Sequence, residues 1–383
     1  MIDYVKGADI STLLEVEQCG GAYYDGGVKK DLLDILKSHD FNYVRLRLWN
    51  DPYAENGTPY GAGTNDLPTT ISLARRAIEH GMGFLLDFHY SDFWTDPGKQ
   101  IIPKAWKREK AETAAGHALT DEEYIAYLEH EVHDFTASSI NALKAAGVAP
   151  TMVQVGNEIT NGLLWPYGQK PAYDNLARFV NAGIRAVRET LPGVPVMIHL
   201  DNGGNHEMYL DWFDHFCERG EAFEIIGLSY YPFWHGTLKD LADNMNDICL
   251  RYDKQLIVAE VSMGHTMEDY ASYEKLAPTE RKGMATRQEL VDKIEHPMTM
   301  EGQCEFLKDF LAVVDAVPEG RGRGFFYWEP GWIPVPGSGW ATYEALEFTG
   351  EKGPLGNEWA NQALFDYDGN ALPSLTVIEQ LHH

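Results

Sequence analysis

The chain has 383 residues, of which 44% are hydrophobic and 12% are aromatic, so it carries enough apolar side chains for a large core and is not a disordered protein. Its formal net charge is −27 and its acidic residues are scattered, which makes nucleic acids and anionic membranes poor partners. No apolar run is long enough to cross a membrane, and the charge does not exclude neutral substrates.

Eight short apolar runs are predicted to be β-strands, and amphipathic stretches fill the intervals between them. The alternation continues along the chain without a linker, a low-complexity tract or an internal sequence repeat that would separate domains. The predicted strands cover residues 4–10, 43–48, 83–88, 151–156, 194–200, 225–229, 255–261 and 324–328.

The first clear helical pattern lies at 71–81, between the second and third strands. Its spacing places Ile71, Ala74 and Ile78 on one face, which we expect to pack against the strands. The pattern ends at Gly81, and glycine is a typical residue at the C-terminal end of a helix.

Two further helices are predicted from capping and from periodicity. Thr120 and Glu123 have the spacing of a capping box, which predicts that a helix begins there. The apolar stripes of this helix and of a later one are formed by Ile125, Leu128, Val132 and Phe135 and by Cys304, Leu307, Phe310, Leu311 and Val314.

Eight strands alternating with helices predict a (β/α)8 TIM barrel, in which parallel strands enclose a packed interior and helices cover the outside. A doubly wound sheet is the alternative, but no GxGxxG sequence follows the first strand. We therefore expect a single barrel domain over residues 1–383. The longest stretches outside the core, 89–119, 261–298 and 329–371, all follow strands, and loops in that position form the active face of this fold.

The cysteines and the N-terminus say little about the compartment. The four cysteines are far apart and have no CxxC spacing, so they are expected to be free thiols rather than zinc ligands or a disulfide framework. The first residues, MIDYVKGADIS, lack the apolar core of a signal peptide. As written the chain fits a cytoplasmic protein, but a secreted protein whose signal peptide has been removed would look identical. We expect a monomer.

Two glutamates lie where predicted strands end. Glu158 follows the fourth strand in VQVGNEITNG, and Glu260 lies in the seventh strand in VAEVS. Alternation in the fourth strand places Met152 and Gln154 on the inward side with Glu158. Carboxylates at the carboxyl ends of barrel strands are typical of catalytic groups.

Strict alternation in the seventh strand places Leu256 and Val258 on the inward side with Glu260. It turns Ile257 and Ala259 outward, toward the helices. On this prediction Glu260 points across the barrel mouth from the opposite side, so the chain would hold two facing carboxylates.

A pair of carboxyl groups across a barrel mouth fits a retaining glycosidase. One carboxyl protonates the leaving oxygen and later deprotonates water, the other attacks the anomeric carbon, and the two lie about 5–5.5 Å apart. Asn157, beside Glu158, is predicted to hydrogen-bond a sugar 2-hydroxyl. Arg45, in the second strand, is predicted to keep the nucleophile ionised by charge pairing. Each residue alone also fits a structural salt bridge or a helix cap, and only the combination favours catalysis.

Tryptophans gather at the carboxyl ends of the predicted strands, where their faces would stack on the apolar C–H surface of a sugar. Trp94 and Trp328 are the strongest candidates for direct sugar contact, and Trp332 is a further one. Any single tryptophan there also fits a core or loop anchor, so the prediction rests on the group. Its members are Trp49, Trp94, Trp165, Trp234, Trp328, Trp332 and Trp340.

Polar residues near the strand ends are predicted to bind sugar hydroxyls. The candidates are Asp9, His89 and Asn202, which follow or end the first, third and fifth strands. Asp87 lies within an apolar strand and is more typical of a buried structural acid.

No cofactor is expected to be required for catalysis, and no metal site is predicted. Barrel metallohydrolases carry an HxH pair after the first strand, where this chain reads GADIS, so His89, His199 and His206 are not predicted to bind a metal. The stretch DYDGN (366–370) resembles a calcium loop but lacks the downstream glutamate, and a turn before the last helix is expected there.

Eight stretches, in order along almost the whole chain, form a specific combined pattern. They are KGADIS (6–11), YVRLRLWNDP (43–52), LLDFHYSDFWTDPG (85–98), VGNEITNGLLWP (155–166), LSYYPFWHG (228–236), VAEVS (258–262), YWEPGWIP (327–334) and WANQALFDYDGNALPS (359–374). Together they resemble glycoside hydrolase family 53, the arabinogalactan endo-β-1,4-galactanases of clan A. The NE pair and the later glutamate define only the clan, whereas SYYPFWHG and YWEPGWIP narrow the resemblance to the family.

The resemblance implies roles for individual residues. Glu158 matches the acid/base of the family and Glu260 matches the nucleophile. Asn157 and Arg45 match supporting residues of the clan.

Two aromatic positions follow from the same resemblance. Tyr230 and Tyr231 both match the position from which a tyrosine hydroxyl contacts the nucleophile, and we favour Tyr231. Trp328 matches the tryptophan that forms the floor of the −1 sugar site.

The seventh loop departs from the family pattern. Several bacterial members carry a calcium site rich in aspartate, glycine and histidine there, whereas this chain reads HTMEDYASYEKLAPTERKGMATRQELVDKIEHP and has no DGDGH run. A calcium ion held in that way is therefore in doubt, and a structural calcium ion stays an open alternative.

The resemblance implies hydrolysis, with retention, of internal β-1,4-galactosidic bonds in galactan or type I arabinogalactan, the side chains of pectin. Another retaining endoglycosidase of clan A, such as a mannanase or a cellulase, is the alternative within the same class. A non-catalytic galactan-binding barrel is the alternative from another class, and it would be indicated by loss of one of the two glutamates.

Overall fold

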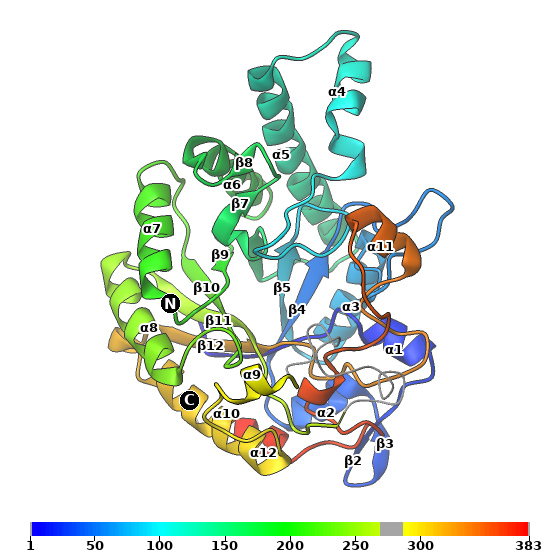
Figure 1. Ribbon diagram of the computed structural model, residues 1–383, viewed down its shortest axis with the longest axis vertical. Coiled ribbons are helices and arrows are strands. Elements are labelled where there is room, and N and C mark those ends of the chain that lie inside the picture. The colour runs from blue at the N-terminus through cyan, green and yellow to red at the C-terminus, as the bar shows by residue number, and fades with distance from the viewer. Residues whose placement is uncertain (1, 269–285, 382–383) are drawn as a thin grey trace.

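The computed structural model describes residues 2–268 and 286–381, and in it eight parallel strands close into a barrel, as predicted (Figure 1). Strands that follow one another along the chain are neighbours in the barrel, and the last pairs with the first. Every predicted strand is present, with ends that agree with the prediction to within two residues. The strands are β1 (Val5–Asp9), β4 (Tyr43–Leu48), β5 (Gly83–Phe88), β6 (Met152–Val155), β9 (Val196–Leu200), β10 (Ile225–Tyr230), β11 (Gln255–Val261) and β12 (Gly322–Tyr327).

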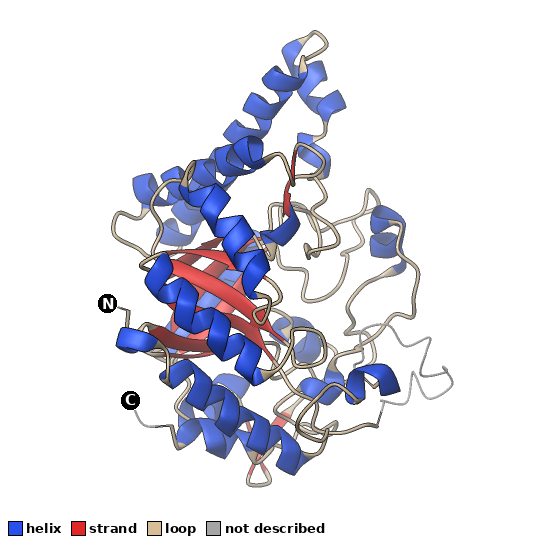
Figure 2. Cartoon of the chain, turned by 60° about the vertical axis from the view of Figure 1, so that its left-hand side comes forward, coloured by secondary structure: helices blue, strands red, loops and turns tan. Residues whose placement is uncertain are grey.

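Helices cover the outside of the barrel (Figure 2). The longer ones are α3 (Leu67–Glu79), α5 (Asp121–Ala145), α6 (Tyr173–Thr190), α7 (His206–Cys217), α8 (Leu238–Arg251) and α10 (Met300–Asp315). The shorter ones are α1 (Leu13–Gln18), α2 (Leu32–Ser38), α4 (Arg108–Ala115), α9 (Gln288–Val291), α11 (Tyr343–Thr349) and α12 (Ser374–Glu379). Within residues 2–268 and 286–381, no helix is both long and apolar enough to span a membrane.

Short elements complete the described part of the chain. Two small antiparallel pairs are formed by β2 (Tyr23–Asp25) with β3 (Val28–Lys30) and by β7 (Gly162–Leu163) with β8 (Gly168–Gln169). Single 3₁₀ turns are η1 (Lys104–Trp106), η2 (Ile159–Asn161), η5 (Pro318–Gly320) and η6 (Ala360–Gln362).

The predicted face of α3 is partly wrong. Ala74 is buried, but Ile78 is 41% exposed, and the packed face also contains Leu73 and Ala77. The apolar residues of this helix cover a wider arc than the barrel buries, so periodicity alone misplaces the centre of the contact. Gly81 adopts a left-handed conformation with φ 69°, just beyond the end of the helix.

The other two helical predictions are confirmed. Thr120 and Glu123 form a complete capping box, in which each side chain accepts a hydrogen bond from the backbone N–H of the other. The stripe of α10 is buried except at Cys304, which is partly exposed.

Apolar side chains from the strands fill the lower part of the barrel. Met152 points into this interior as predicted, while Val153 and Val155 on the same strand pack toward the helices. The buried members of the interior cluster are Val5, Leu85, Met152, Met197, Ile225, Ile257, Ala259 and Phe326. The barrel is therefore a packed core, and its chemistry is confined to the end where the strands finish.

The predicted facing of β11 is wrong below Glu260. Ile257 and Ala259 belong to the interior cluster, and Leu256 and Val258 pack in the layer between the strands and the helices. Glu260 nevertheless faces inward, because a β-bulge inserts one residue into the strand and shifts the alternation by one.

The pairing of β11 with each neighbouring strand shows this extra residue. On one side Leu228 pairs with Val258 and the next residue, Ser229, pairs with Glu260, so Ala259 has no partner of its own. On the β12 side the same stretch of β11 is also one residue longer than its partner.

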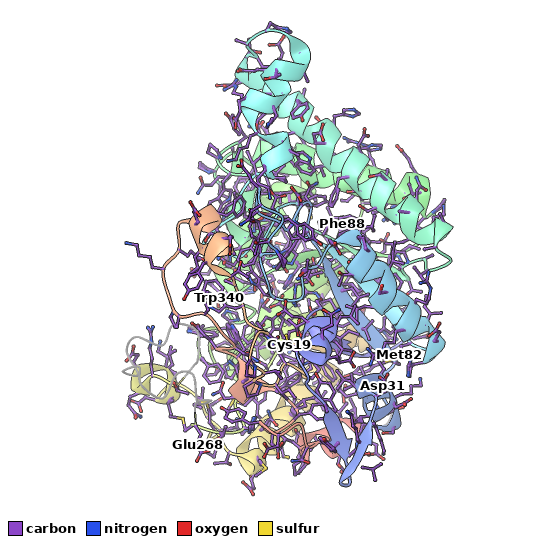
Figure 3. The ribbon with its side chains drawn as sticks, turned by 90° about the vertical axis from the view of Figure 1, so that its right-hand side faces the viewer. Cys19, Asp31, Met82, Phe88, Glu268 and Trp340 are labelled. Atoms are coloured by element: carbon purple, nitrogen blue, oxygen red, sulfur yellow. The ribbon has the colours of Figure 1, made fainter. Side chains whose placement is uncertain are left out.

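The loops that follow β5 and β12 meet across the carboxyl end of the barrel. Trp94 Nε1, after β5, donates a hydrogen bond of 3.0 Å to the backbone oxygen of Trp340, after β12. Figure 3 labels Trp340 on the part of the chain close to α11. The stretch 366–370 forms the turn expected there, in which Asp366 Oδ1 accepts hydrogen bonds from the N–H groups of Asp368 and Asn370.

Candidate active site

Glu158 and Glu260 face each other across the barrel mouth, as predicted. Their carboxylates approach so closely that an oxygen of one lies within 4.8 Å of an oxygen of the other. Glu260 extends from the end of β11, and Glu158 lies three residues beyond β6. Glu158 has φ 47° and ψ 49°, a left-handed conformation that is unfavourable for a residue with a side chain.

Glu260 is held by two donors, Arg45 on β4 and Tyr231 just beyond the end of β10. Arg45 Nη1 lies 3.0 Å from Oε1, and the Tyr231 hydroxyl donates to Oε2 at 2.7 Å. Burial raises the pKa of Glu260, while the positive charge of Arg45 and the hydrogen bond from Tyr231 oppose that rise. Tyr230 points away from the site and donates to the backbone oxygen of Gly236, so Tyr231 is the tyrosine that contacts Glu260.

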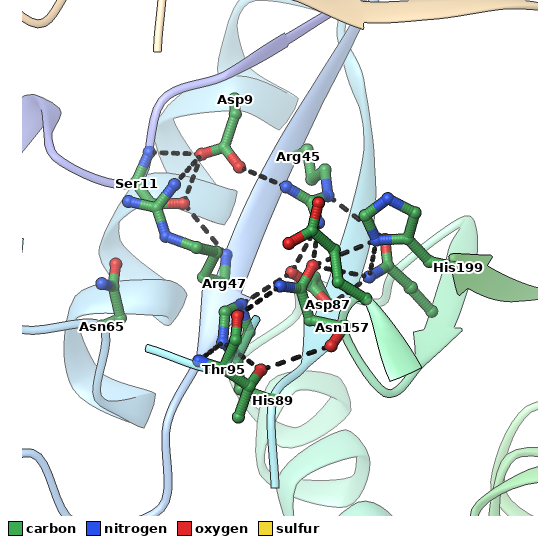
Figure 4. A network of polar contacts seen from close by, with 12 residues as sticks. Asp9, Ser11, Arg45, Arg47, Asn65, Asp87, His89, Thr95, Asn157 and His199 are labelled. Carbon is green, nitrogen blue, oxygen red and sulfur yellow. Dashed lines mark hydrogen bonds and ion pairs between the residues drawn. The ribbon is translucent and has the colours of Figure 1, made fainter. Parts of the chain in front are cut away.

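Arg45 lies fully buried beneath the pair, and its guanidinium group is fully engaged (Figure 4). Its contacts are Nη1 with Asp9 at 2.9 Å and with Glu260 at 3.0 Å, Nη2 with Asp87 at 2.8 Å and with Asn157 at 2.8 Å, and Nε with Gln154 at 3.2 Å. Two carboxylates besides Glu260 therefore hold the cation in place. Asp87 is the buried structural acid that the sequence indicated.

Glu158 has a different environment. The Ser229 hydroxyl donates a hydrogen bond of 2.6 Å to Oε1. Burial and the nearby charge of Glu260 raise the pKa of Glu158 well above its usual range. Because Arg45 and Tyr231 favour the charge on Glu260, a single proton shared by the pair resides on Glu158.

The pair opens into a cleft of about 570 Å³. Trp94 and Trp328 line it as predicted, with ring centroids 6.2 Å apart. The aromatic row continues through Trp359, whose ring lies 5.0 Å from Trp328 and 5.7 Å from Trp234. The tryptophans lining the cleft are Trp94, Trp328, Trp340 and Trp359, and its charged groups besides the glutamate pair are Asp96, Lys99, Glu351 and Glu358.

Several predicted substrate-binding residues lie elsewhere. Asp9 and His89 have no exposed surface, so they lie beneath the cleft instead of contacting a sugar. Trp332 is 1% exposed and packs behind Trp328, with ring centroids 5.7 Å apart. Asn202 is partly exposed but is not among the described residues that line the cleft.

The burial of these residues has clear causes. Asp9 is bound by Arg45 and by Arg47, whose Nη1 lies 3.0 Å from Asp9 Oδ1. His89 Nε2 lies 3.1 Å from Asp87, and its Nδ1 accepts from the backbone N–H of Thr95. These ion pairs and hydrogen bonds hold the polar groups below the surface that a substrate can reach.

Ser229 and Trp359 were not predicted as site residues. Ser229 lies inside an apolar strand, where a serine gives no signal of its role. Trp359 lies more than 30 residues beyond β12, although its segment is part of the family-like pattern. Neither residue belongs to a cysteine or histidine motif, which would have been visible in the sequence. Their contacts with the site form only when the strands assemble into the barrel.

One further property of the pair concerns metals. Glu158, His199 and Glu260 present ligand atoms within 4.8 Å of one another, a spacing that a metal ion could bridge. The contacts favour hydrogen bonding instead, because Arg45 would repel a cation beside Glu260 and His199 Nε2 contacts the Ser229 hydroxyl at 2.9 Å. We still expect catalysis without a metal. The calcium prediction concerns the seventh loop, of which residues 269–285 lie outside the described residues.

Comparison with known proteins identifies the family of this chain. The sequence profile of Glycosyl hydrolase family 53 matches residues 5–378. The chain belongs to glycosyl hydrolase family 53. Membership of family 53 makes it a glycoside hydrolase and confirms the resemblance seen in the sequence.

Relatives with assigned names cover almost the whole chain. The endo-β-1,4-galactanase of Bacillus subtilis (strain 168) is 35% identical over 396 residues, which is 98% of this chain and 86% of that protein. The arabinogalactan endo-β-1,4-galactanase of Humicola insolens is 30% identical over 385 residues, 98% and 99% of the two chains. A solved family 53 catalytic domain from Ignisphaera aggregans is 37% identical, with a TM-score of 0.86, and the match covers 100% of this chain and 97% of that one.

Proposed function

We propose that this family 53 hydrolase cleaves internal β-1,4-galactosidic bonds in galactan and type I arabinogalactan, with retention of the anomeric configuration. Glu260 is the nucleophile and Glu158 is the acid/base. The main support is the carboxylate pair, whose oxygens approach within 4.8 Å while the two groups have different partners. An inverting enzyme needs about 6.5–9.5 Å between its carboxyl groups to admit a water molecule.

In the first step Glu260 attacks the anomeric carbon of the sugar in the −1 site. The bond from this carbon to the glycosidic oxygen breaks, and that oxygen takes the proton from Glu158. The product is a glycosyl-enzyme ester on Glu260, and the positive charge of Arg45 has kept the attacking oxygen ionised up to that point.

In the second step Glu158, now ionised, removes a proton from water. The water oxygen bonds to the anomeric carbon, and Glu260 leaves as a carboxylate. Tyr231 donates to the Glu260 carboxylate and stabilises the charge that returns to it. The two displacements each invert the anomeric centre, so the overall outcome is retention.

The substrate class rests on the cleft and on the relatives. The tryptophans offer flat apolar surfaces for the C–H faces of sugars, and the charged groups beside them offer partners for hydroxyls. The galactanases of Bacillus subtilis and Humicola insolens support galactan as the polymer.

Release of reducing sugar from potato galactan, mannan and carboxymethylcellulose tests the substrate. We expect release from galactan, in which internal cleavage lowers the polymer length before short products accumulate. Proton NMR of the first products should show the β-anomer. Release from mannan or carboxymethylcellulose alone would support the alternative clan A enzymes and overturn the proposal.

Replacing the nucleophile tests the mechanism. Glu260→Ala should abolish hydrolysis and leave galactan binding largely intact, because the cleft tryptophans remain. Added azide should restore turnover of an activated aryl β-galactoside and give a product of the opposite anomeric configuration. Glu79→Ala, an exposed substitution at the end of α3, is the control. Substantial hydrolysis by Glu260→Ala without added nucleophile would refute the assignment.

A further inference from the structure

Two side chains, Ser229 and His199, lead from the acid/base Glu158 into the barrel. Ser229, on β10, donates its hydroxyl hydrogen to Glu158 Oε1 at 2.6 Å. His199, on β9, lies behind it, with Nε2 2.9 Å from the Ser229 oxygen. Both Ser229 and His199 are fully buried, so no solvent molecule competes for these contacts.

The contact with Ser229 indicates which nitrogen of His199 carries the proton. A serine hydroxyl has one hydrogen, and Ser229 gives it to the carboxylate. His199 Nε2 must therefore donate to the Ser229 oxygen, which leaves Nδ1 as the acceptor when the ring is neutral. Gln154 Nε2 lies 3.1 Å from Nδ1 and supplies an N–H. Asn157 Oδ1 also lies 3.1 Å from Nδ1, but this acceptor takes its hydrogen from Arg45 Nη2 at 2.8 Å. Burial and the charge of Arg45 lower the pKa of His199 well below its usual range, so the ring is neutral.

We propose that Ser229 and His199 are positioning residues for the acid/base, a role that rests on the proposed function. His199 fixes the Ser229 hydroxyl, and the hydroxyl engages one oxygen of Glu158, so proton transfer occurs at the other oxygen in both steps. An oxygen that accepts a short hydrogen bond is the less basic of the two, so the acid form carries its proton on Oε2. The same arrangement serves the ionised form, because Ser229 donates in both states.

The surroundings of Glu158 make this donor important. The charged or titratable groups that face Glu158 are Glu260, His199, Asp201, Asp96, Tyr231 and Tyr209. Those that face His199 are Glu158, Glu260, Arg45, His89 and His235. Three of the groups around Glu158 are carboxylates, which disfavour a further negative charge. The Ser229 hydrogen bond acts in the opposite direction and lowers the pKa of Glu158.

The test is the pH profile of Ser229→Ala on galactan. Loss of a donor to the ionised form raises the pKa of Glu158, so the basic limb of kcat/KM should move to higher pH. We expect kcat to fall about tenfold, since the carboxyl loses a hydrogen bond to its charged form. Ser139→Ala, a buried serine on α5 away from the mouth, should retain the native profile and kcat.

Substitutions of His199 separate positioning from packing. His199→Leu removes the donor to Ser229 and should shift the basic limb in the same direction as Ser229→Ala. His199→Gln retains an N–H donor and should restore most of the native profile. The double variant Ser229→Ala/His199→Leu should be no slower than Ser229→Ala alone, because His199 acts through the hydroxyl.

The outcomes are distinct. If the native protein releases nothing from galactan, the proposed function falls. If the native protein is active but Ser229→Ala has the same basic limb as Ser139→Ala, the inference falls and the function stands. Thermal unfolding shows whether each variant is folded. If Ser229→Ala does not fold, the comparison of His199→Leu with His199→Gln tests the inference instead. If the basic limbs of kcat/KM lie at the same pH in these two variants, the inference is overturned.

Discussion

Replacing Tyr231 by phenylalanine removes one hydrogen bond from the nucleophile and leaves the ring in place. The hydroxyl donates to Glu260 Oε2 at 2.7 Å, while the ring packs against His235 and Trp234 at centroid distances of 5.5 Å and 6.0 Å. Phenylalanine preserves those ring contacts. The change therefore isolates the effect of the hydrogen bond on Glu260.

The size of the effect follows from the charge on the acceptor. A hydrogen bond to an ionised group contributes about 1.5–3 kcal/mol, which corresponds to a factor of about 10 to 150 in rate. Tyr231 stabilises the charge that returns to Glu260 when the glycosyl-enzyme breaks down, so the second step should slow by up to that factor. KM should fall together with kcat, because the glycosyl-enzyme accumulates.

The pH profile should change in a defined direction. The hydrogen bond favours the ionised form of Glu260 and opposes the effect of burial on its pKa. Without it the pKa rises, so a smaller fraction of the free enzyme is ionised at acidic pH. The acidic limb of kcat/KM should move to higher pH by about one unit, because Arg45 remains to favour the charge.

The neighbouring tyrosine provides a matched control. Tyr230 donates to the backbone oxygen of Gly236 at 3.0 Å and stacks with Phe306 and Phe310, outside the cleft. Tyr230→Phe should lower the free energy of unfolding by about 1 kcal/mol and leave both limbs of the profile in place. If Tyr231→Phe retains the acidic limb and the kcat of Tyr230→Phe, the reasoning about Glu260 is wrong.

Three further predictions concern the acid/base, the cleft and the fold. Glu158→Ala should slow cleavage of galactan far more than formation of the glycosyl-enzyme from an aryl galactoside with an activated leaving group, and equal losses in pre-steady-state measurements would rule out its role as acid. Trp359→Ala should raise KM for galactan more than it lowers kcat, because its ring lines the cleft beside Trp328 and offers a surface for sugar stacking, and an unchanged KM would contradict that stacking. Thr120→Ala should lower the free energy of unfolding by about 1 kcal/mol through loss of the α5 capping box, with kcat unaffected, as denaturant titration and galactan assays would show.

The fold was largely predictable because buried parallel strands appear in a sequence as short apolar runs. The faces of those strands were predictable only where alternation is regular, as in β6. In β11 the bulge at Ala259 reverses the assignment for the residues below Glu260. A bulge of this kind leaves no mark in the local sequence, because the inserted residue is an ordinary small apolar one.

The site was predictable at its centre and less so around it. Glu158, Glu260 and Arg45 are chemically unusual in apolar strands, so they stand out in the sequence. The sequence does not show how deeply a side chain is buried. Asp9 and His89 were therefore expected to reach the substrate, although both are fully buried. Whether a polar group ends above or beneath the floor of the cleft depends on ion pairs between strands that are distant in sequence.

The bulge in β11 allows one strand both to pack the barrel interior and to present the nucleophile. Below it Ile257 and Ala259 fill the barrel interior, and above it Glu260 is presented to the substrate. A regular strand would face Glu260 outward if those two residues kept their places in the core. Through the extra residue, one strand presents apolar side chains to the interior and a carboxylate to the cleft on the same inward side.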